Sequence, residues 1–200
     1  MELTVVFATQ NAGKMKEINE IMKGSSLCAV SMRDLNMDAE IIEDGETFLD
    51  NALIKAKKVA ELTGMPAMAE DSGLEVDHLN GRPGVLSARF MGKDTPYDIK
   101  NQKILTMLKG VPFERRTARF KCAAVFIDTD GQILSAEASL TGVIAHEAAG
   151  DNGFGYDPIL YIPELSKTSA QLSVAEKNVV SHRGKALRSL IKQIEDKYTI

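Results

Sequence analysis

Residues 3–8 limit the possible folds more than any other part of the sequence. They read Leu-Thr-Val-Val-Phe-Ala, with apolar and β-branched side chains and no charge. Such a strand is typical of an α/β sheet that is covered on both faces. Apolar side chains then recur at helical spacing, at Met15, Ile18, Ile21 and Met22. The chain therefore begins with a buried strand, a turn and an amphipathic helix.

The turn between this strand and this helix is polar and consists of Thr9, Gln10, Asn11, Ala12, Gly13 and Lys14. Backbone N–H groups, the positive end of a helix and an ammonium group meet there, which suits a phosphate. The turn does not match the G-x-x-x-x-G-K-[ST] loop, because Thr9 replaces its first glycine and Met15 follows the lysine. An ordinary turn with a surface lysine remains the alternative.

A second polar stretch, Glu70-Asp71-Ser72-Gly73, separates an apolar run at residues 65–69 from an alternating run at residues 74–77. We interpret it as an acidic corner where two strands meet, with Gly73 allowing a tight turn. Adjacent carboxylates repel each other and lose solvation, so a structure that keeps them offers a cation, and Mg²⁺ is the first candidate. The alternative is an Asx-type turn in which Asp71 or Ser72 only binds the backbone.

A long helix is expected after residues 41–45. Thr47 is a suitable N-cap, and Thr63 and Gly64 before Pro66 end the helix. Phe48, Ala52, Leu53, Ala56, Val59 and Ala60 form its buried stripe. Asn51 and Lys55 project from one side of it at i, i+4 spacing. Such a pair is usually solvated, unless the helix start lies beside Asp71, where Lys55 could reach a substrate phosphate.

The second half of the chain predicts a helix, a hairpin, a glycine-rich loop and a terminal helix. The helix covers residues 97–109, with Ile99, Ile104, Leu105 and Leu108 facing inward, and the hairpin turns at Asp130-Gly131. The loop Gly153-Phe154-Gly155-Tyr156-Asp157 presents aromatics that either stack on a planar ring or fill the core. A capping box at residues 173–176 precedes the terminal amphipathic helix, and His182 and Arg183 fall in that helix's first turn, where donors are expected to face outward.

Composition excludes several classes of protein. The chain of 200 residues is 44% hydrophobic and 26% charged, as in a single globular domain. Its net charge of -4 disfavours binding to a nucleic acid polymer. Cys28 and Cys122 lack metal-ligand spacing and are expected to be buried. Neither a signal peptide nor a membrane span is recognisable, so a cytoplasmic location is the default expectation.

Six of these motifs occur together in one order, and their combination resembles the inosine/xanthosine triphosphate pyrophosphatase family. The motifs are the turn from Ala8 to Lys14, residues 43–55, residues 70–74, residues 83–89 with Pro83-Gly84 and Ser87-Ala88-Arg89, residues 153–158, and Glu176-Lys177 with Ser181-His182-Arg183. They span nearly the full chain, which makes the resemblance specific.

The resemblance implies an α/β fold with an elongated mixed β-sheet flanked by helices. It further implies one catalytic domain, residues 1–200, with two lobes, a central active-site cleft and usually a homodimer. The implied reaction is Mg²⁺-dependent hydrolysis of noncanonical purine nucleoside triphosphates (ITP, dITP, XTP) to the monophosphate and pyrophosphate, which cleanses the nucleotide pool.

The resemblance also implies roles for individual residues. Glu43 and Asp71 hold the metal, Asp71 is the general base, and Lys55 compensates charge. The triphosphate is held by Thr9, Gln10, Asn11, Ala12, Gly13 and Lys14, and Ser72 contacts the substrate. Phe154 stacks on the purine, beside Gly155, and Tyr156, Asp157, Lys177, His182 and Arg183 line the pocket for the base.

The chemistry of the reaction agrees with these roles. Mg²⁺ and lysines stabilise the charge that develops on phosphate oxygens and on the departing pyrophosphate. Hypoxanthine and xanthine carry a 6-oxo acceptor where adenine has a donor, so donors such as Lys177 and Arg183 favour the oxo form. Two other functions stay open. One is a related pyrophosphatase for other modified or pyrimidine triphosphates, and the other is a nucleotide-binding protein without turnover.

Overall fold

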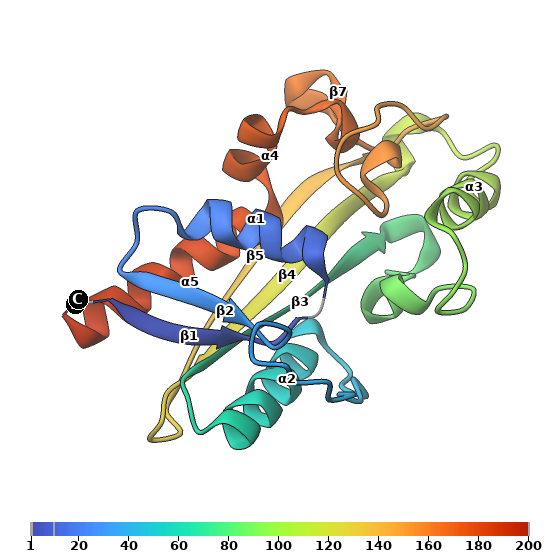
Figure 1. Cartoon of the computed structure of the whole chain (residues 1–200). Coiled ribbons are helices and arrows are strands. Elements are labelled where there is room, and N and C mark those ends of the chain that lie inside the picture. Colours follow the sequence, from blue (N-terminus) through green and yellow to red (C-terminus); the bar gives the residue numbers. More distant parts are fainter. Residues whose placement is uncertain (1, 10, 200) are drawn as a thin grey trace. The chain divides into compact units, whose positions relative to one another are not determined.

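The computed structural model describes residues 2–9 and 11–199 and contains a mixed sheet flanked by helices (Figure 1). The strands are β1 (Leu3–Phe7), β2 (Leu27–Ser31), β3 (Ala67–Val76), β4 (Thr117–Ile127), β5 (Ile133–Ile144), β6 (Leu160–Ile162) and β7 (Lys167–Thr168). The helices are α1 (Ala12–Met22), α2 (Phe48–Thr63), α3 (Tyr97–Met107), α4 (Val174–Val180) and α5 (His182–Tyr198). Short 3₁₀ segments include Gly84–Arg89 and Asp157–Ile159.

Within the described residues the sheet has seven strands in the order β2-β1-β3-β4-β5-β6-β7. The strand β1 is parallel to both β2 and β3, whereas β5–β6 and β6–β7 are antiparallel. The two parallel connections run through α1 and α2, as parallel pairing requires. The predicted α/β class with a mixed sheet flanked by helices is thereby confirmed.

The chain divides into two compact units. The first contains Met1–Asp71, Cys122–Ala138 and His182–Ile200, and the second contains Ser72–Lys121 and Ser139–Ser181. The boundary between the first two stretches falls inside β3, between Asp71 and Ser72. Each unit has its own apolar core, so each is described separately.

The first unit has two apolar layers because its central strands are buried on both faces. Val5 and Phe7 of β1 pack in a cluster with Ile18 of α1 and with Leu187 and Leu190 of α5. The alternate residues Val6 and Ala8 pack in a second cluster with Ala52, Ala56 and Val59 of α2. Accordingly, α1 and α5 lie side by side on one side of β1 and β2, and α2 lies on the other (Figure 1). The uncharged strand at residues 3–8 therefore occupies the position that its composition predicted.

The second unit packs around one apolar cluster. Leu74 and Val76 of β3, Ile104 and Leu108 of α3, and Ile159 and Leu160 near β6 belong to it. The prediction that α3 turns Ile104 and Leu108 inward is confirmed, but the prediction for Ile99 is wrong, since this side chain is exposed.

The predictions for the two cysteines, both in the first unit, are half right: Cys122 is buried, and Cys28 is only partly buried.

The expected acidic corner at residues 70–73 does not exist. Residues 67–76 form one continuous strand, β3, and Gly73 lies inside it rather than in a turn. Successive side chains of a strand point to opposite faces. Glu70 therefore lies on the same face as Met68, in the layer of α1 and α5, and Asp71 lies on the face of Ala69, in the layer of α2. The two carboxylates do not share one cation.

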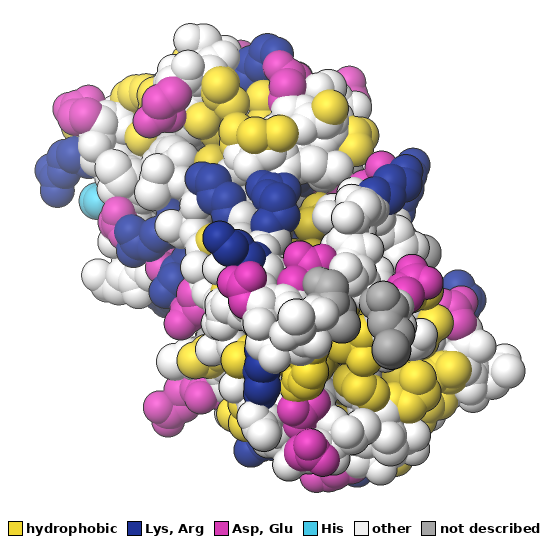
Figure 2. All heavy atoms as spheres, turned by 90° about the vertical axis from the view of Figure 1, so that its left-hand side faces the viewer, with side chains coloured by type: hydrophobic (Ala, Val, Ile, Leu, Met, Phe, Trp, Pro, Cys, Tyr) yellow, Lys and Arg dark blue, Asp and Glu magenta, His cyan; other side chains and the backbone are white. Residues whose placement is uncertain are grey.

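The surface drawn in Figure 2 carries Lys and Arg side chains next to Asp and Glu side chains, with apolar groups between them. The net charge of -4 is thus not gathered into one acidic patch on this face. None of the described helices is long and apolar enough to cross a membrane.

The start of α2 is set by a reciprocal cap that the sequence predicted only in part. The Thr47 hydroxyl accepts a hydrogen bond from the backbone N–H of Asp50 (3.1 Å), and the Asp50 carboxylate accepts one from the backbone N–H of Thr47 (3.0 Å). Gly64 ends the helix in the left-handed conformation, with φ of 65°. Thr47 at its start and Gly64 at its end fix the length of α2, the helix that carries Asn51 and Lys55.

We predict that Thr47→Ala lowers the free energy of unfolding by about 1 kcal/mol, because it leaves the backbone N–H of Asp50 without its side-chain acceptor. Urea denaturation followed by circular dichroism measures this change. The control Thr47→Ser keeps the hydroxyl and should stay close to the parent protein. Equal stability of the Ala variant and the parent would show that this cap is not needed.

Candidate active site

The polar turn after β1 lies at the carboxyl edge of the parallel strands. Phe7 pairs with Met68 across β1 and β3, so Thr9, just after β1, and Glu70 of β3 each follow two residues after this pair. The Asn11 side chain caps α1 by accepting a hydrogen bond from the Lys14 N–H (3.1 Å). Ligands of open α/β sheets bind at such carboxyl edges, next to helix N-termini. Gln10 lies outside the described residues, as does the side chain of Ala12.

The first cluster of charged side chains forms on the α2 face of β3. The ammonium of Lys55 lies 2.6 Å from Glu43 Oε2 and 3.1 Å from Asp71 Oδ1. Asn51 Nδ2 donates to the second oxygen of Asp71 at 3.3 Å. Asn51 and Lys55 lie one turn apart on α2 and both contact Asp71, so the start of this helix lies beside that carboxylate.

The segment before α2 is held against the cluster by Asn51. Its Oδ1 accepts a hydrogen bond from the backbone N–H of Gly45 at 2.8 Å. A Cβ on Gly45 would come within 2.5 Å of the Asp50 Cβ and 2.9 Å of the Asn51 Oδ1. A side chain does not fit at position 45, so the backbone two residues after Glu43 can approach the helix closely.

Burial and charge act in opposite directions on this cluster. Burial raises the pKa of Asp71; Lys55 lowers it, and the neighbouring carboxylates of Glu43 and Glu70 raise it again, so that it ends above its ordinary value. Burial alone would lower the pKa of Lys55, but Asp71 and Glu43 outweigh it and raise it. Lys55 therefore stays a cation, while Asp71 becomes a better proton acceptor than an ordinary aspartate.

The carboxylate oxygens of Glu43 and Asp71 fit a hard divalent cation whose other ligands come from a bound phosphate compound and water. Glu43 and Asp71 converge on one positive group, the Lys55 ammonium. Among the described residues no group of three His, Cys, Asp or Glu side chains is placed to hold a metal. Mg²⁺ commonly binds through one or two carboxylates plus phosphate oxygens and water, so two carboxylates are enough for a metal that arrives with a nucleotide.

A second charged cluster forms on the opposite face of β3, in the layer of α1 and α5. Glu70 Oε1 lies 2.7 Å from the Lys14 ammonium and 3.3 Å from Arg183 Nη2. Arg183 Nη1 in turn donates to Glu17 Oε2 at 2.6 Å. Burial would raise the pKa of Glu70, but Arg183 and Lys14 outweigh it and hold the pKa well below its usual range. Burial and Glu70 raise the pKa of the Cys122 thiol, which approaches the same carboxylate.

The position of Arg183 differs from the one expected. Sequence reasoning placed His182 and Arg183 with outward-facing donors, but both side chains are buried, Arg183 with 3% of its side chain exposed. The physical reason is that the first turn of α5 packs into the layer that contains Glu70 and Glu17. Two carboxylates there pair with the buried guanidinium, and an outward-facing Arg183 would lose both ion pairs.

In the second unit, Asp157 organises the glycine-rich loop. Its Oδ2 accepts hydrogen bonds from the Lys177 ammonium (2.7 Å) and from the Phe154 backbone N–H (2.8 Å), and its Oδ1 accepts one from the Ser169 hydroxyl (2.7 Å). The Lys177 ammonium also lies 5.1 Å from the centre of the Phe154 ring. Three predicted site residues, Phe154, Asp157 and Lys177, are therefore in contact with one another.

The two aromatics of this loop have different environments. Phe154 keeps 39% of its surface exposed and can receive a planar ring. Tyr156 is 3% exposed, and its hydroxyl donates to the Ser87 carbonyl at 2.9 Å. Tyr97 packs edge-on against it, with ring centres 5.3 Å apart, and Asn101 Nδ2 donates to the Gly155 carbonyl at 3.0 Å. Of the two alternatives for the aromatics, stacking suits Phe154 and core filling describes Tyr156.

The predicted site residues thus form three groups. Glu43, Lys55 and Asp71 make one in the first unit, and Lys14 and Arg183 belong to another in the same unit. Phe154, Asp157 and Lys177 form the third in the second unit. Ser72 lies on β3, half-buried, next to Asp71.

Three residues of these clusters were missed as site residues, namely Glu17, Asn51 and Glu70. A correct interpretation of residues 67–76 as one strand would have separated Glu70 from Asp71 by face and directed attention to a second set of cations. Nothing comparable in the sequence pointed to Glu17, which lies one helical turn after Lys14.

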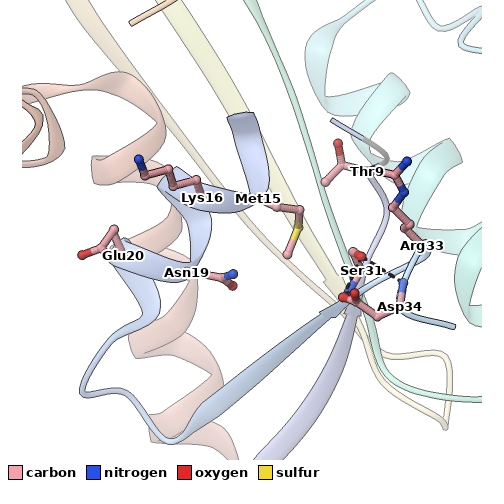
Figure 3. Close-up of a pocket in the computed structure, with 8 residues that line it drawn as sticks. All are labelled: Thr9, Met15, Lys16, Asn19, Glu20, Ser31, Arg33 and Asp34. Atoms are coloured by element: carbon pink, nitrogen blue, oxygen red, sulfur yellow. Dashed lines mark hydrogen bonds between the residues drawn. The ribbon is translucent and has the colours of Figure 1, made fainter. Parts of the chain in front are cut away.

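A pocket of about 460 Å³ opens beside the turn after β1 (Figure 3). Lys16, Asn19 and Glu20 of α1 line one side, and Arg33 and Asp34 line the other, where Arg33 extends toward Thr9. Hydrogen bonds from Ser31 and the charge of Arg33 lower the pKa of Asp34. The lining of the pocket thus mixes both signs of charge, and it includes Thr9 of the predicted triphosphate-binding turn.

With this geometry in view, comparison with known proteins places the chain in a class of nucleotide-processing α/β proteins. The sequence model of the Ham1 family matches residues 5–193, and the chain belongs to that family. A dITP/XTP pyrophosphatase from Desulforamulus reducens is 46% identical over 98% of this chain and 98% of the relative. One from Nitratidesulfovibrio vulgaris is 49% identical over 94% of each chain. The solved structure of a HAM1 protein from Coxiella burnetii has a TM-score of 0.88 at 38% identity, covering 97% of this chain and 99% of that one. The family resemblance predicted from the six motifs is confirmed.

We predict that Gly153→Ala lowers the free energy of unfolding by more than the backbone strain alone, because a Cβ there would crowd the Asp157 carboxylate and lie 2.8 Å from the Lys177 ammonium, so that their buried pair must shift. Gly131→Ala is the matched control. It has nearly the same φ, +79° against +77°, but nothing within 4 Å of the new Cβ, so only backbone strain of about 1 kcal/mol is expected. Urea denaturation of both variants separates the two costs, and equal losses would contradict the crowding argument.

Proposed function

We propose that this protein hydrolyses noncanonical purine nucleoside triphosphates, namely ITP, dITP and XTP, to the monophosphate and pyrophosphate, and so cleanses the nucleotide pool. Relatives named dITP/XTP pyrophosphatases match nearly the whole chain. The observation that carries the proposal is the Lys55 ammonium held between Glu43 and Asp71, in the same unit as the turn after β1. This arrangement combines a cation, a pair of metal-binding carboxylates and a helix N-terminus.

The triphosphate-binding part of the proposal rests on the first unit. Its residues are Thr9, Gln10, Asn11, Ala12, Gly13 and Lys14, with Lys55 for charge compensation and Ser72 as a further substrate contact. Asn11 supports this role because its side chain fixes the first turn of α1, where backbone N–H groups lack carbonyl partners. The Lys14 side chain is 22% exposed, so its ammonium remains accessible to an anion.

The proposed metal ion is Mg²⁺, held by Glu43 and Asp71. When bound, it neutralises charge on the phosphate oxygens and on the departing pyrophosphate. Lys55 acts on the same oxygens from the protein side and keeps its charge, because the adjacent carboxylates raise its pKa.

Asp71 is the proposed general base. A water oxygen forms a bond to the α-phosphorus while the bond between that phosphorus and the pyrophosphate oxygen breaks, and one proton of the water passes to the Asp71 carboxylate. Asp71 is suited to this transfer by its place, since its carboxylate contacts both Lys55 and Asn51 at the start of α2. Asn51 orients the carboxylate through its hydrogen bond to Oδ2.

The base-binding part of the proposal rests on Phe154, Gly155, Tyr156, Asp157, Lys177, His182 and Arg183. The exposed ring of Phe154 supports a stacking role. Asp157 supports selectivity indirectly, since it orients both Phe154 and the Lys177 ammonium. Donors of this kind favour the 6-oxo group of hypoxanthine and xanthine over the 6-amino group of adenine.

Two other functions use the same architecture. A related pyrophosphatase for other modified or pyrimidine triphosphates would keep the first-unit clusters and change the base contacts. A nucleotide-binding protein without turnover would not need Asp71 beside Lys55 and Glu43, so this cluster disfavours it. We further propose that the protein acts in the cytoplasm, where nucleotide precursors are used, and that it forms a homodimer, which light scattering would test.

We predict that hydrolysis of ITP, dITP or XTP far exceeds that of ATP and GTP and requires Mg²⁺, with IMP and pyrophosphate as the products of ITP. Steady-state assays with and without Mg²⁺ and chromatography of the products measure this. Phosphate release without added inorganic pyrophosphatase would indicate a phosphatase, and absence of any product would indicate a binding protein. A preference for pyrimidine triphosphates would overturn the assignments in the base pocket.

We also predict that Asp71→Asn lowers kcat for ITP about 100-fold or more, because the amide cannot accept the proton of the attacking water. Thermal unfolding should show that the variant is still folded. Asp77→Asn is the control, since Asp77 is an acid of the second unit that pairs with Arg119, and it should leave kcat close to that of the parent. Substantial turnover by Asp71→Asn would remove Asp71 from the role of base.

A further inference from the structure

Glu70 is the most deeply buried carboxylate of the two charged clusters, with 1% of its side chain exposed. Its Oε1 contacts two cations that come from different elements, Lys14 of α1 at 2.7 Å and Arg183 of α5 at 3.3 Å. Neither the proposed metal site nor the proposed proton transfer uses it. A buried charge in such a position is costly unless its partners hold it, so the function of this pair of contacts needs an explanation.

Glu70 is not placed to act on the substrate directly. It lies on the face of β3 opposite to Asp71, so it does not belong to the metal-binding pair. Its carboxylate lies within ion-pair distance of two cations, Lys14 and Arg183, so it is paired as an anion and would repel a phosphate. Lys14 and Arg183 are the two cations that its carboxylate contacts, so we follow the effect of Glu70 on phosphate binding through them.

Lys14 is the cation through which that effect can pass. Its side chain is 22% exposed, whereas that of Arg183 is 3% exposed and is also bound to Glu17 at 2.6 Å. An ammonium has three N–H donors, so Lys14 can keep its ion pair with Glu70 and still donate to a phosphate. A free lysine side chain loses about 2 kcal/mol of rotamer entropy when it is fixed, and the ion pair removes part of that cost before a ligand arrives.

We propose that Glu70 is a positioning residue for phosphate binding, which fixes the Lys14 ammonium at the turn after β1 and is itself anchored by Arg183. This inference rests on the proposed role of Lys14 in triphosphate binding. It assigns to Arg183 a second task besides its proposed contact with the base, because the guanidinium contacts the same Oε1 of Glu70 as Lys14 does and helps to neutralise it. Phosphate binding is thereby tied to the first turn of α5.

The test is a double-mutant cycle of Glu70→Gln and Lys14→Gln. Two experiments are made on each variant: steady-state kinetics with ITP, which gives KM and kcat, and binding of inorganic tripolyphosphate, a probe that has no base, which gives a Kd. Glu70→Gln should raise KM and the tripolyphosphate Kd about tenfold. In the Lys14→Gln variant, Glu70→Gln should change KM and the tripolyphosphate Kd by less than twofold, because the lysine through which Glu70 acts is already absent. Glu20→Gln is the control, since it removes an exposed carboxylate of α1 that pairs with Lys23 and belongs to neither cluster, and it should change the tripolyphosphate Kd by less than twofold.

Equal effects of Glu70→Gln in both backgrounds would overturn the proposal and show that Glu70 only supports the fold. So would an unchanged tripolyphosphate Kd in a folded variant. If Glu70→Gln does not fold, Glu70→Asp replaces it in the cycle, since it keeps the charge and moves it away from Lys14 by one methylene. If the parent binds tripolyphosphate but does not hydrolyse ITP, the proposed function fails while the cycle still decides the role of Glu70.

Discussion

The arrangement of charge in the first unit depends on the alternation of side chains along β3. Two adjacent carboxylates, Glu70 and Asp71, would repel each other if they shared one environment. The strand separates them by turning them to opposite faces, where each meets its own cations, Lys14 and Arg183 on one face and Lys55 on the other. The continuous strand is therefore what allows two acidic residues in succession to serve two different tasks.

The cations reach these carboxylates because helices cover both faces of the sheet. The connection through α1 places Lys14 at the carboxyl edge of β1, and the connection through α2 places Lys55 beside Asp71. A parallel pair of strands requires such crossovers. The same connections that bury the uncharged strand β1 thus supply the charges of the site, and the apolar pattern at residues 3–8 is linked to the chemistry at residues 70 and 71.

Local patterns were sufficient to predict several single elements, whereas the mixed sheet flanked by helices was implied by the family resemblance. The bounds of α2 followed from Thr47 and Gly64, and the existence of β1 and α1 followed from composition and spacing, because these signals depend only on neighbouring residues. The face of β3 on which each acid lies depends on the register of a strand within the sheet, and a short apolar run next to a glycine does not specify that register. The burial of Arg183 beside Glu17 and Glu70 also depends on contacts between elements far apart in the chain, so local patterns could not predict it.

The charge balance of the first unit bears on the need for a divalent cation. Its two clusters contain three cations, Lys14, Lys55 and Arg183, against four acids, Glu17, Glu43, Glu70 and Asp71. When all are ionised the clusters are net negative, and each cation is already within ion-pair distance of a carboxylate. A polyanionic triphosphate would gain little from such a surface by itself. A metal bound by Glu43 and Asp71 would reverse the local sign, so the proposed dependence on Mg²⁺ follows from the excess of acids in these clusters as well as from the chemistry of phosphoryl transfer.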